Sequence, residues 1–273
     1  TGANISVAIT KEFMDAVENG SDYPLRFPDV DNYSGENKKA YDDQWMHVGD
    51  VREWEKMGYP VKTYRTIKAK DLWNLINICA TYSAEPGIFF IDNANEMTNA
   101  VGYKQKVVCT NPCGEQPLAP YSVCNLAAIN LANMVDRDKA EVDWKKLEKT
   151  IRIAIRMQDS VIDKTHYFLE ENKTQALGER RIGLGIMGLH DLLIWCNKRY
   201  GSKDANVLVD ELFRFISTNA YEESIEIAKV KGSFPFLETE ENVELFLQSG
   251  FIKKLPEYIR ESIRKNGIRN SHL

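Results

Sequence analysis

Short apolar runs that suit strands alternate along this chain with longer segments whose apolar residues recur at helical spacing. The strand-like runs are Ile5–Ile9, Ile88–Ile91 and Ile182–Leu184. The helical segments are Lys11–Asn19, Lys70–Ser83, a long segment that opens at Asp143, Leu189–Cys196, and a second long segment from Asp204 to Gly232. When the spacing of apolar residues changes repeatedly along one chain, from every second position to about every 3.6 positions, the pattern is typical of α/β folds. The sequence therefore predicts an α/β architecture.

Capping residues and apolar stripes predict where these helices begin and what they cover. Thr10 has the character of an N-cap, and Gly20 of a C-terminal stop. The helix that opens at Asp143 carries a stripe at near-helical spacing: Trp144, Leu147, Ile151, Ile155, Gln158 and Ile162. Its other side is basic and is expected to be solvated, which makes it an outer helix lying on a sheet. Asp204 is expected to cap the last long helix, and Glu240–Gln248 and Pro256–Lys265 to form shorter ones. The polar stretch Asp22–Pro60 is expected to be mostly hairpin and loop.

Composition excludes some classes of protein. A chain of 273 residues with 43% hydrophobic content can bury a large core, and its net charge of −5 gives no reason to expect a nucleic-acid partner. No apolar run approaches ~18 residues, so no membrane span is expected. The five cysteines, Cys79, Cys109, Cys113, Cys124 and Cys196, are too scattered for a secreted disulfide scaffold. They favour a reducing cytoplasm, with Cys79 and Cys109 expected to be packed in the interior.

One stretch has the residue types of a reactive site. Asn111, Cys113 and Glu115 lie two residues apart, and in an extended backbone their side chains would share one face. Pro112 has no N–H for a sheet ladder, and Gly114 allows a close approach by a ligand or another backbone. The pattern predicts a strand-like projecting loop that presents an amide, a thiol and a carboxylate together. The plainer reading makes Cys113 a small buried residue beside a turn former and a solvated acid.

The segment also carries a close family resemblance. Thr110-Asn111-Pro112-Cys113-Gly114-Glu115-Gln116-Pro117-Leu118, followed by Cys124-Asn125-Leu126, resembles the active-site segment of the large catalytic subunit of ribonucleotide reductase. Its Asn-Pro-Cys-Gly-Glu form is more similar to the adenosylcobalamin-dependent class II enzymes than to the iron-dependent class I. Weaker matches are Asn4–Thr10, Pro86–Asp92 and Arg180–Leu189. The resemblance implies that residues 1–273 are a single-domain fragment, a middle portion of a ten-stranded α/β barrel with a central finger loop that carries Cys113.

The resemblance also implies roles for individual residues. Cys113 would become a thiyl radical that takes the 3′ hydrogen of a ribonucleotide, with Glu115 accepting the 3′-hydroxyl proton and Asn111 holding the sugar hydroxyls. Cys124 would be one of two cysteines that reduce the substrate and become a disulfide, its partner lying before this chain begins. The implied radical source is adenosylcobalamin, or else a separate metal-containing subunit. The implied partners are a nucleotide effector, a thioredoxin-like reductant, and the missing segments of the same enzyme or a complementary chain.

Two other readings of the residues remain open. Gly183-Leu184-Gly185-Ile186-Met187-Gly188 has the glycine spacing of a dinucleotide-binding loop but lacks its later acidic partner, so a nucleotide-dependent oxidoreductase of another class is an alternative. Cys109, Cys113 and Cys124 could instead serve a zinc-binding or interaction module, although no Cys-x-x-Cys pair and no nearby histidine supports zinc. Asp92, at the end of a predicted strand, is either a ligand-facing residue or a helix cap.

Overall fold

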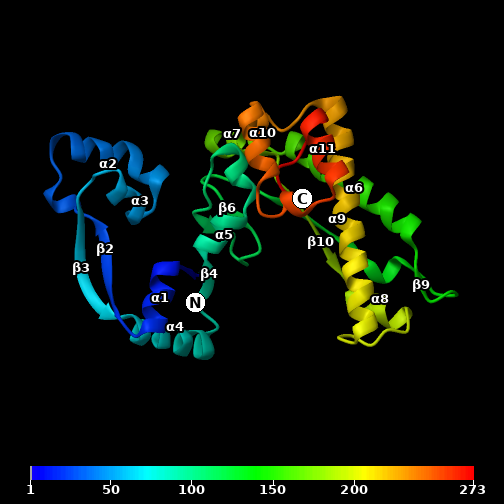
Figure 1. Ribbon diagram of the computed structural model, residues 1–273, viewed down its shortest axis with the longest axis horizontal. Helices are drawn as coiled ribbons and strands as arrows, with labels where there is room; N and C mark the ends of the chain where they lie inside the picture. Colours follow the sequence, from blue (N-terminus) through cyan, green and yellow to red (C-terminus); the bar gives the residue numbers. More distant parts are fainter. Residues whose placement is uncertain (1) are drawn as a thin grey trace. The chain divides into compact units, whose positions relative to one another are not determined.

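The computed structural model describes residues 2–273, which alternate between helices and short strands (Figure 1). Their contacts divide them into two compact units. The first contains residues 2–96 and Val107–Pro120, and the second contains Met97–Lys106 and Tyr121–Leu273. The α/β class is confirmed. Within residues 2–273 every sheet has two strands, so no closed barrel is present in this part of the chain.

The first unit is built on a parallel pair of strands, β1 (Ser6–Ile9) and β4 (Gly87–Phe90). Helix α1 (Lys11–Asn19) follows β1 and packs on α4 (Ala69–Ser83), with Ile9, Phe13 and Ile76 in the shared core. The predicted caps of α1 are confirmed. Thr10 Oγ1 accepts the Phe13 N–H at 3.2 Å, and Gly20 ends the helix in a left-handed conformation.

Between α1 and α4 the chain forms a module whose sequence predicts its structure only in part. The expected hairpin is present as β2 (Asp22–Pro28) and β3 (Val61–Lys68), with an irregularity at Leu25/Arg26. The expected loop is wrong, because this stretch also forms η1 (Val30–Asn32), α2 (Gly35–Val48) and α3 (Val51–Lys56). Aromatic packing explains the difference. Trp54 is fully buried beside Tyr33 and Ala40, and its indole N–H donates to the Tyr33 hydroxyl at 2.8 Å.

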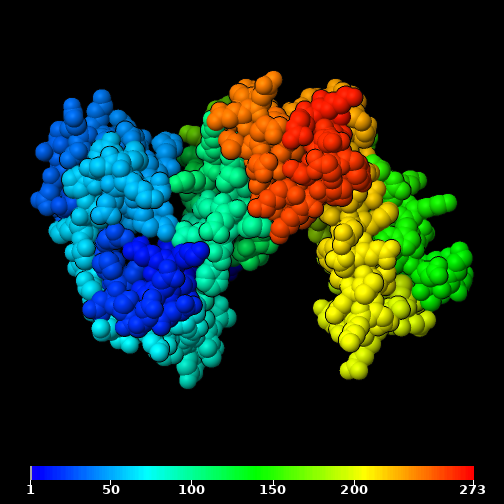
Figure 2. All heavy atoms as spheres, in the orientation of Figure 1, coloured from blue at the N-terminus to red at the C-terminus, as the bar shows by residue number. Residues whose placement is uncertain are grey.

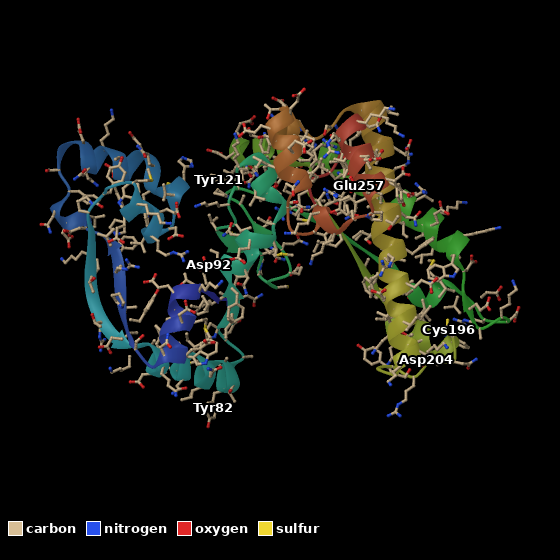
Figure 3. The ribbon with its side chains drawn as sticks, viewed as in Figure 1. Tyr82, Asp92, Tyr121, Cys196, Asp204 and Glu257 are labelled. Carbon is tan, nitrogen blue, oxygen red and sulfur yellow. The ribbon has the colours of Figure 1, made fainter. Side chains whose placement is uncertain are left out.

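Helix α5 (Ile91–Met97) follows β4, and its residue Asp92 holds elements of the first unit together. One Asp92 oxygen accepts the Lys11 N–H at 2.7 Å and so caps α1, and the carboxylate pairs with Arg52 of α3 at 2.8 Å. Figure 3 shows Asp92 beside the start of α1. The hydrogen bond from Arg52 lowers the pKa of Asp92, since it favours the charged carboxylate. Of the two readings of Asp92, the structure therefore supports the cap.

The second unit is built on the parallel pair β7 (Asn125–Asn130) and β10 (Ile182–Met187). The predicted strand at Ile182–Leu184 is confirmed and is three residues longer than expected, since it runs to Met187. Helix α6 (Trp144–Lys164) lies on this pair with Leu147, Ile151 and Ile155 fully buried, as its stripe predicted. The Asp143 carboxylate caps it by accepting the Lys146 N–H at 3.0 Å.

Helix α9 (Lys203–Lys231) packs along α6. In the space-filling view, yellow atoms of α8 and α9 lie against green atoms of the second unit (Figure 2). Ser202 caps α9 by accepting the Ala205 N–H, so the prediction that Asp204 is the cap is wrong; Asp204 lies in the first turn instead. On the basic side of α6, Lys145, Lys149 and Arg156 are exposed as expected, whereas Arg152 is only partly exposed. Arg152 pairs with Glu222 and Glu223 of α9 at 3.1 and 3.3 Å.

The remaining elements of the second unit are short. They are η2 (Asn99–Tyr103), η3 (Leu131–Asn133), β8 (Val135–Asp136), β9 (Glu141–Val142), α7 (Glu170–Glu179), α8 (Leu189–Trp195), η4 (Pro235–Leu237), α10 (Glu240–Leu247), η5 (Ile252–Lys254) and α11 (Glu257–Asn266). The predictions of α8, α10 and α11 are confirmed. Tyr103, Phe234, Phe246 and Ile263 form the core under α10 and α11. Within residues 2–273, none of the helices is both long and apolar enough to cross a membrane.

Two predictions about buried thiols are wrong. Cys79 and Cys109 are both exposed. Helix α4 buries Ala69 and Ile76, whereas Leu75 of the same apolar stripe is 55% exposed. Within its own unit, α4 thus buries fewer residues of its apolar stripe than the sequence predicts. Tyr82, labelled at the end of α4 in Figure 3, is likewise exposed.

Candidate active site

The Cys113 segment is a tight hairpin in the first unit. Strand β5 (Cys109–Thr110) pairs antiparallel with β6 (Pro117–Leu118), placing Thr110 opposite Pro117. The Asn111 N–H donates to the Gln116 carbonyl at 3.1 Å, and the Gly114 N–H donates to the Asn111 carbonyl at 3.0 Å. The second bond closes a four-residue turn with Pro112 and Cys113 at its centre. Gly114 has φ +86°, a conformation that favours glycine.

This geometry corrects one step of the sequence argument and supports its outcome in part. The chain turns at Asn111–Gly114 rather than continuing extended, so alternation along a strand does not place the side chains. The turn still joins two of them, because the Asn111 amide nitrogen donates to the Glu115 carboxylate at 2.5 Å. The Asn111 amide oxygen accepts the Gln116 N–H at 2.9 Å, which fixes the orientation of the amide. An amide held at both ends therefore lies beside a carboxylate.

Cys113 lies at the centre of the same turn and is exposed. Its thiol is available to a reactant rather than enclosed in the core. Proline at the preceding position restricts φ and stiffens the turn. The hairpin thus supplies an accessible thiol on a short turn whose two flanking polar side chains bond to each other.

Cys124 belongs to the second unit and lies directly before β7. It is half-buried, and its thiol donates to the Asn125 carbonyl at 3.6 Å. The same carbonyl accepts a hydrogen bond from the Gln158 amide of α6. Among residues 2–273 the cysteines form no disulfide, and no three His, Cys, Asp or Glu side chains gather as a metal site.

The glycine-spaced segment does not have the layout of a phosphate-binding loop. Gly183 and Gly185 lie inside β10, in register with Leu126 and Ala128 of β7, whereas dinucleotide-binding glycines occupy the turn after the strand. Gly188 alone lies at the strand-to-helix turn, with φ +70°. A Cβ there would come within 2.8 Å of the Asn130 side-chain oxygen, so glycine is required for packing. The strand-to-helix turn is therefore tightly packed at Gly188.

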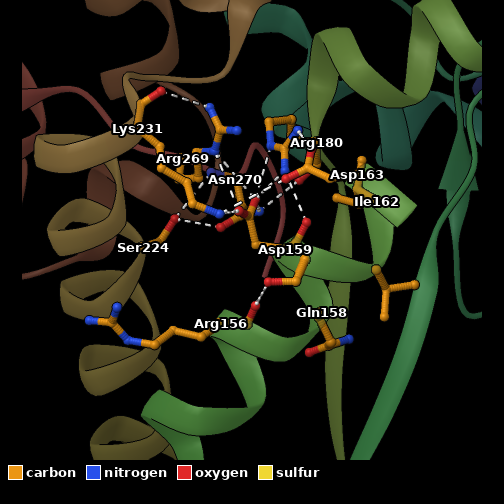
Figure 4. A network of polar contacts seen from close by, with 12 residues as sticks. Arg156, Gln158, Asp159, Ile162, Asp163, Arg180, Ser224, Lys231, Arg269 and Asn270 are labelled. Atoms are coloured by element: carbon orange, nitrogen blue, oxygen red, sulfur yellow. Dashed lines mark hydrogen bonds and ion pairs between the residues drawn. The ribbon is translucent and has the colours of Figure 1, made fainter. Parts of the chain in front are cut away.

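A buried polar network joins α6, the end of α7, α9 and the C-terminal segment (Figure 4). Asp159, 1% exposed, accepts from Arg180 Nε at 2.9 Å and from the Asn270 amide at 3.1 Å. Arg180 also bonds to Asp163 at 2.8 Å, and Ser224 donates to Asn270 at 2.9 Å. Burial acts to raise the pKa of Asp163, but the hydrogen bond and charge of Arg180 outweigh it and leave that pKa low. This network was not predicted from the sequence, although two adjacent arginines directly before an apolar strand are a signal of buried charge.

A second polar group lies where the C-terminal segment meets β10. The Ile182 N–H donates to the His272 carbonyl at 3.2 Å, and the Asn99 amide donates to the Ser271 carbonyl at 2.9 Å. The His272 ring contacts the Ser271 hydroxyl at 3.0 Å. Loss of hydration lowers the pKa of His272 well below its ordinary value, and the positive charge of Arg181 lowers it further.

This histidine gives a testable dependence of stability on pH. Because its folded-state pKa is depressed, the unfolded chain binds a proton that the folded chain does not as pH falls below about 6.5. We expect the melting temperature to fall between about pH 7.5 and pH 5. His272→Gln, which cannot titrate, should flatten that decline. Thermal melts of both chains across this range test the expectation, and parallel pH profiles would contradict it.

Comparison with known proteins agrees with these motifs. The sequence matches the family described as "Ribonucleotide reductase, barrel domain" over residues 1–273. It is 34% identical over 232 residues to a vitamin B12-dependent ribonucleoside-diphosphate reductase of Thermoplasma acidophilum, covering 85% of this chain and 26% of that protein. It is 38% identical over 174 residues to the protein of the same name from Mycobacterium tuberculosis, covering 64% of this chain and 25% of that protein.

The similarity extends to reductases that carry no vitamin B12 in their names. A ribonucleoside-diphosphate reductase large chain of Cryptosporidium parvum is 30% identical over 277 residues, covering 96% of this chain and 33% of that protein. The chain thus spans about a quarter to a third of the length of these relatives. The match over its whole length, together with the Cys113 hairpin, shows that the chain belongs to the ribonucleotide reductase barrel-domain family.

Proposed function

We propose that the protein containing this chain reduces ribonucleotides to deoxyribonucleotides by thiyl-radical chemistry, and that this chain supplies Cys113, Glu115, Asn111 and Cys124. The observation that carries the proposal is the Cys113 hairpin. An exposed thiol lies on a turn whose flanking amide and carboxylate are joined at 2.5 Å. The names of the relatives favour ribonucleoside diphosphates as substrates.

Each residue has a defined task in this reaction. The Cys113 thiyl takes the 3′ hydrogen of the ribose, while the Glu115 carboxylate accepts the 3′-hydroxyl proton and Asn111 orients the sugar hydroxyls. The 2′-hydroxyl leaves as water. Cys124 and a second cysteine outside this chain become a disulfide, and so supply the two electrons and two protons that balance the loss of water. Cys113 then returns its hydrogen to C3′. General-base help of this kind contributes roughly 10²–10⁴-fold.

The radical source fits the exposed position of Cys113. When bound, adenosylcobalamin would supply the radical that oxidises the Cys113 thiol, and two of the relatives are named as vitamin B12-dependent. A separate metal-containing subunit is the alternative source. The Cys113 thiol lies on an exposed turn rather than in the core, which leaves it accessible to either.

The proposal extends to organisation and partners. We place both units in one catalytic barrel domain, completed to ten strands by the rest of the protein, with the Cys113 hairpin as its finger loop. A thioredoxin-like reductant would regenerate the Cys124 thiol, and a nucleotide effector is a further expected partner. The scattered cysteines favour the reducing cytoplasm as the location.

The proposal is tested with the full-length protein that contains this chain. We expect deoxyribonucleotide formation from ribonucleoside diphosphates when adenosylcobalamin and a dithiol are supplied, and none when either is left out. Product formation is measured chromatographically. Reduction that proceeds without adenosylcobalamin but requires a metal-containing subunit would support the alternative radical source. Inactivity under both conditions, with the nucleotide bound, would contradict the proposed reaction.

A further inference from the structure

Gln158 is a polar residue on the face of α6 that is otherwise buried in the core. It continues the buried stripe of Leu147, Ile151 and Ile155 on α6, and it is 1% exposed. A glutamine at such a position must find hydrogen bonds inside the protein, because water does not reach it. Its partners therefore indicate why a polar residue stands there.

The Gln158 amide nitrogen spans the beginning of both strands of the second unit. It donates to the Gly183 carbonyl of β10 at 2.8 Å and to the Asn125 carbonyl of β7 at 3.1 Å. The Asn125 side chain returns a bond to the Gln158 backbone carbonyl at 3.3 Å. The Gln158 amide oxygen is buried and meets no donor among residues 2–273. Rotating the amide would place that oxygen against two carbonyl oxygens, so the two strands fix its orientation.

The Asn125 carbonyl also accepts a hydrogen bond from a second donor, the Cys124 thiol. Cys124 Sγ donates to it at 3.6 Å. One oxygen thus receives a strong bond from the Gln158 amide and a weak bond from the thiol. The amide fixes the carbonyl in place, and the carbonyl in turn directs the S–H bond.

We propose that Gln158 is a positioning residue for the Cys124 thiol, acting through the Asn125 carbonyl that it anchors. The inference about position stands on these contacts alone, and its catalytic consequence rests on the proposed function. In that function two thiols, Cys124 and its partner, lose two protons and two electrons to the substrate and form one S–S bond. Disulfide geometry tolerates little error in the direction of either sulfur, so a fixed thiol direction favours this step.

The contact also affects how readily the thiol ionises. A hydrogen bond donated by the neutral S–H favours the thiol over the thiolate, and the thiolate is the reactive form. When Gln158 no longer anchors the carbonyl, we expect Cys124 to ionise more readily. A roughly threefold larger thiolate fraction would raise its alkylation rate near neutral pH about threefold.

The test compares four forms of the full-length protein: wild type, Gln158→Met, Gln158→Glu and Asn219→Leu. Methionine keeps the size of the side chain but removes the donor, and glutamate places an oxygen where the nitrogen was. Asn219 is a matched control, since it is a buried amide of the same unit that bonds to the Phe215 carbonyl. Alkylation of each cysteine by iodoacetamide is followed by mass spectrometry. Cys196, buried in the same unit, reports global opening.

We expect Cys124 to react roughly threefold faster or more in both Gln158 variants, with Cys196 unchanged and Asn219→Leu like the wild type. A wild-type rate at Cys124, or an equal rise at Cys196, would overturn the inference. If the variants do not fold, the infrared S–H stretching frequency of Cys124 in the unsubstituted protein tests the contact instead. It is obtained as an infrared difference against Cys124→Ala. A hydrogen-bonded frequency supports the contact, and a free-thiol frequency overturns it.

Turnover separates this inference from the proposed function. If Cys124 reduces the substrate, Gln158→Met should lower kcat on the order of tenfold or more while KM for the ribonucleotide stays unchanged. Faster alkylation together with wild-type kcat would support the positioning of Cys124 and contradict its redox role. Loss of kcat together with faster alkylation would support both.

Discussion

Replacing Cys113 with serine in the full-length protein is expected to abolish ribonucleotide reduction while leaving nucleotide binding unchanged. Serine has nearly the same shape, and the side chain lies exposed on a turn, so the hairpin should form as before. A hydroxyl O–H bond does not give up its hydrogen atom to the radical source as an S–H bond does. The thiyl that begins the reaction would therefore not form.

Deoxyribonucleotide formation and nucleotide affinity, measured on the same preparation, test this prediction. Cys79→Ser is the matched control, because Cys79 is also an exposed thiol of the first unit. It should retain wild-type turnover and binding. Appreciable deoxyribonucleotide formation by Cys113→Ser would remove Cys113 from the proposed mechanism, whatever the control does.

Replacing Asp159 with alanine is expected to lower the free energy of unfolding by ~3–5 kcal/mol. Asp159 is 1% exposed and accepts from Arg180, itself 3% exposed, while Arg269 lies 3.4 Å from the same carboxylate. Removal of the carboxylate takes away one of the two counterions of the buried Arg180 guanidinium and leaves only Asp163, which is 40% exposed. That loss exceeds what a surface ion pair contributes, because solvent cannot replace the lost partner.

Urea unfolding of the chain, with and without the substitution, measures this difference. Asp210→Ala is the control, since it removes an exposed carboxylate that pairs with Arg214 at 2.8 Å along α9. We expect no measurable change there, as for most exposed pairs. Equal stability of the Asp159→Ala and wild-type chains would mean that the buried network contributes little to the fold.

Much of the secondary structure follows from local patterns. The caps Thr10 and Asp143, the stripe of α6 and the strand at Ile182 were predictable because each depends on residues only a few positions apart. The failure to predict helices between Asp22 and Pro60 has a different cause. Helices α2 and α3 depend on the burial of Trp54 against Tyr33, residues that lie 21 positions apart. Local polarity in that stretch gave no sign of such packing.

The candidate site, too, was predictable where it depends on neighbouring residues and unpredictable where it depends on distant ones. Its residues were identified from the sequence, because the Cys113 string and Cys124 with its neighbours are motifs of type and spacing. That Asn111 and Glu115 lie together was also expected, although a turn brings them together rather than an extended strand, and their hydrogen bond was not predicted. Gln158 appeared only as a member of an apolar stripe, since nothing local indicates which carbonyls its amide will reach.

The sequence by itself determined the α/β class, the family and the choice of candidate site residues, because periodicity and motif spacing are properties of neighbouring positions. Only the tertiary structure decided which buried charges pair and which thiols are exposed, and it alone placed the Cys124 thiol and the Gln158 amide at one carbonyl. The physical reason is that a hydrogen bond or an ion pair depends on distance in space. Helix α6 brings Gln158 to Asn125 across 33 positions of the chain.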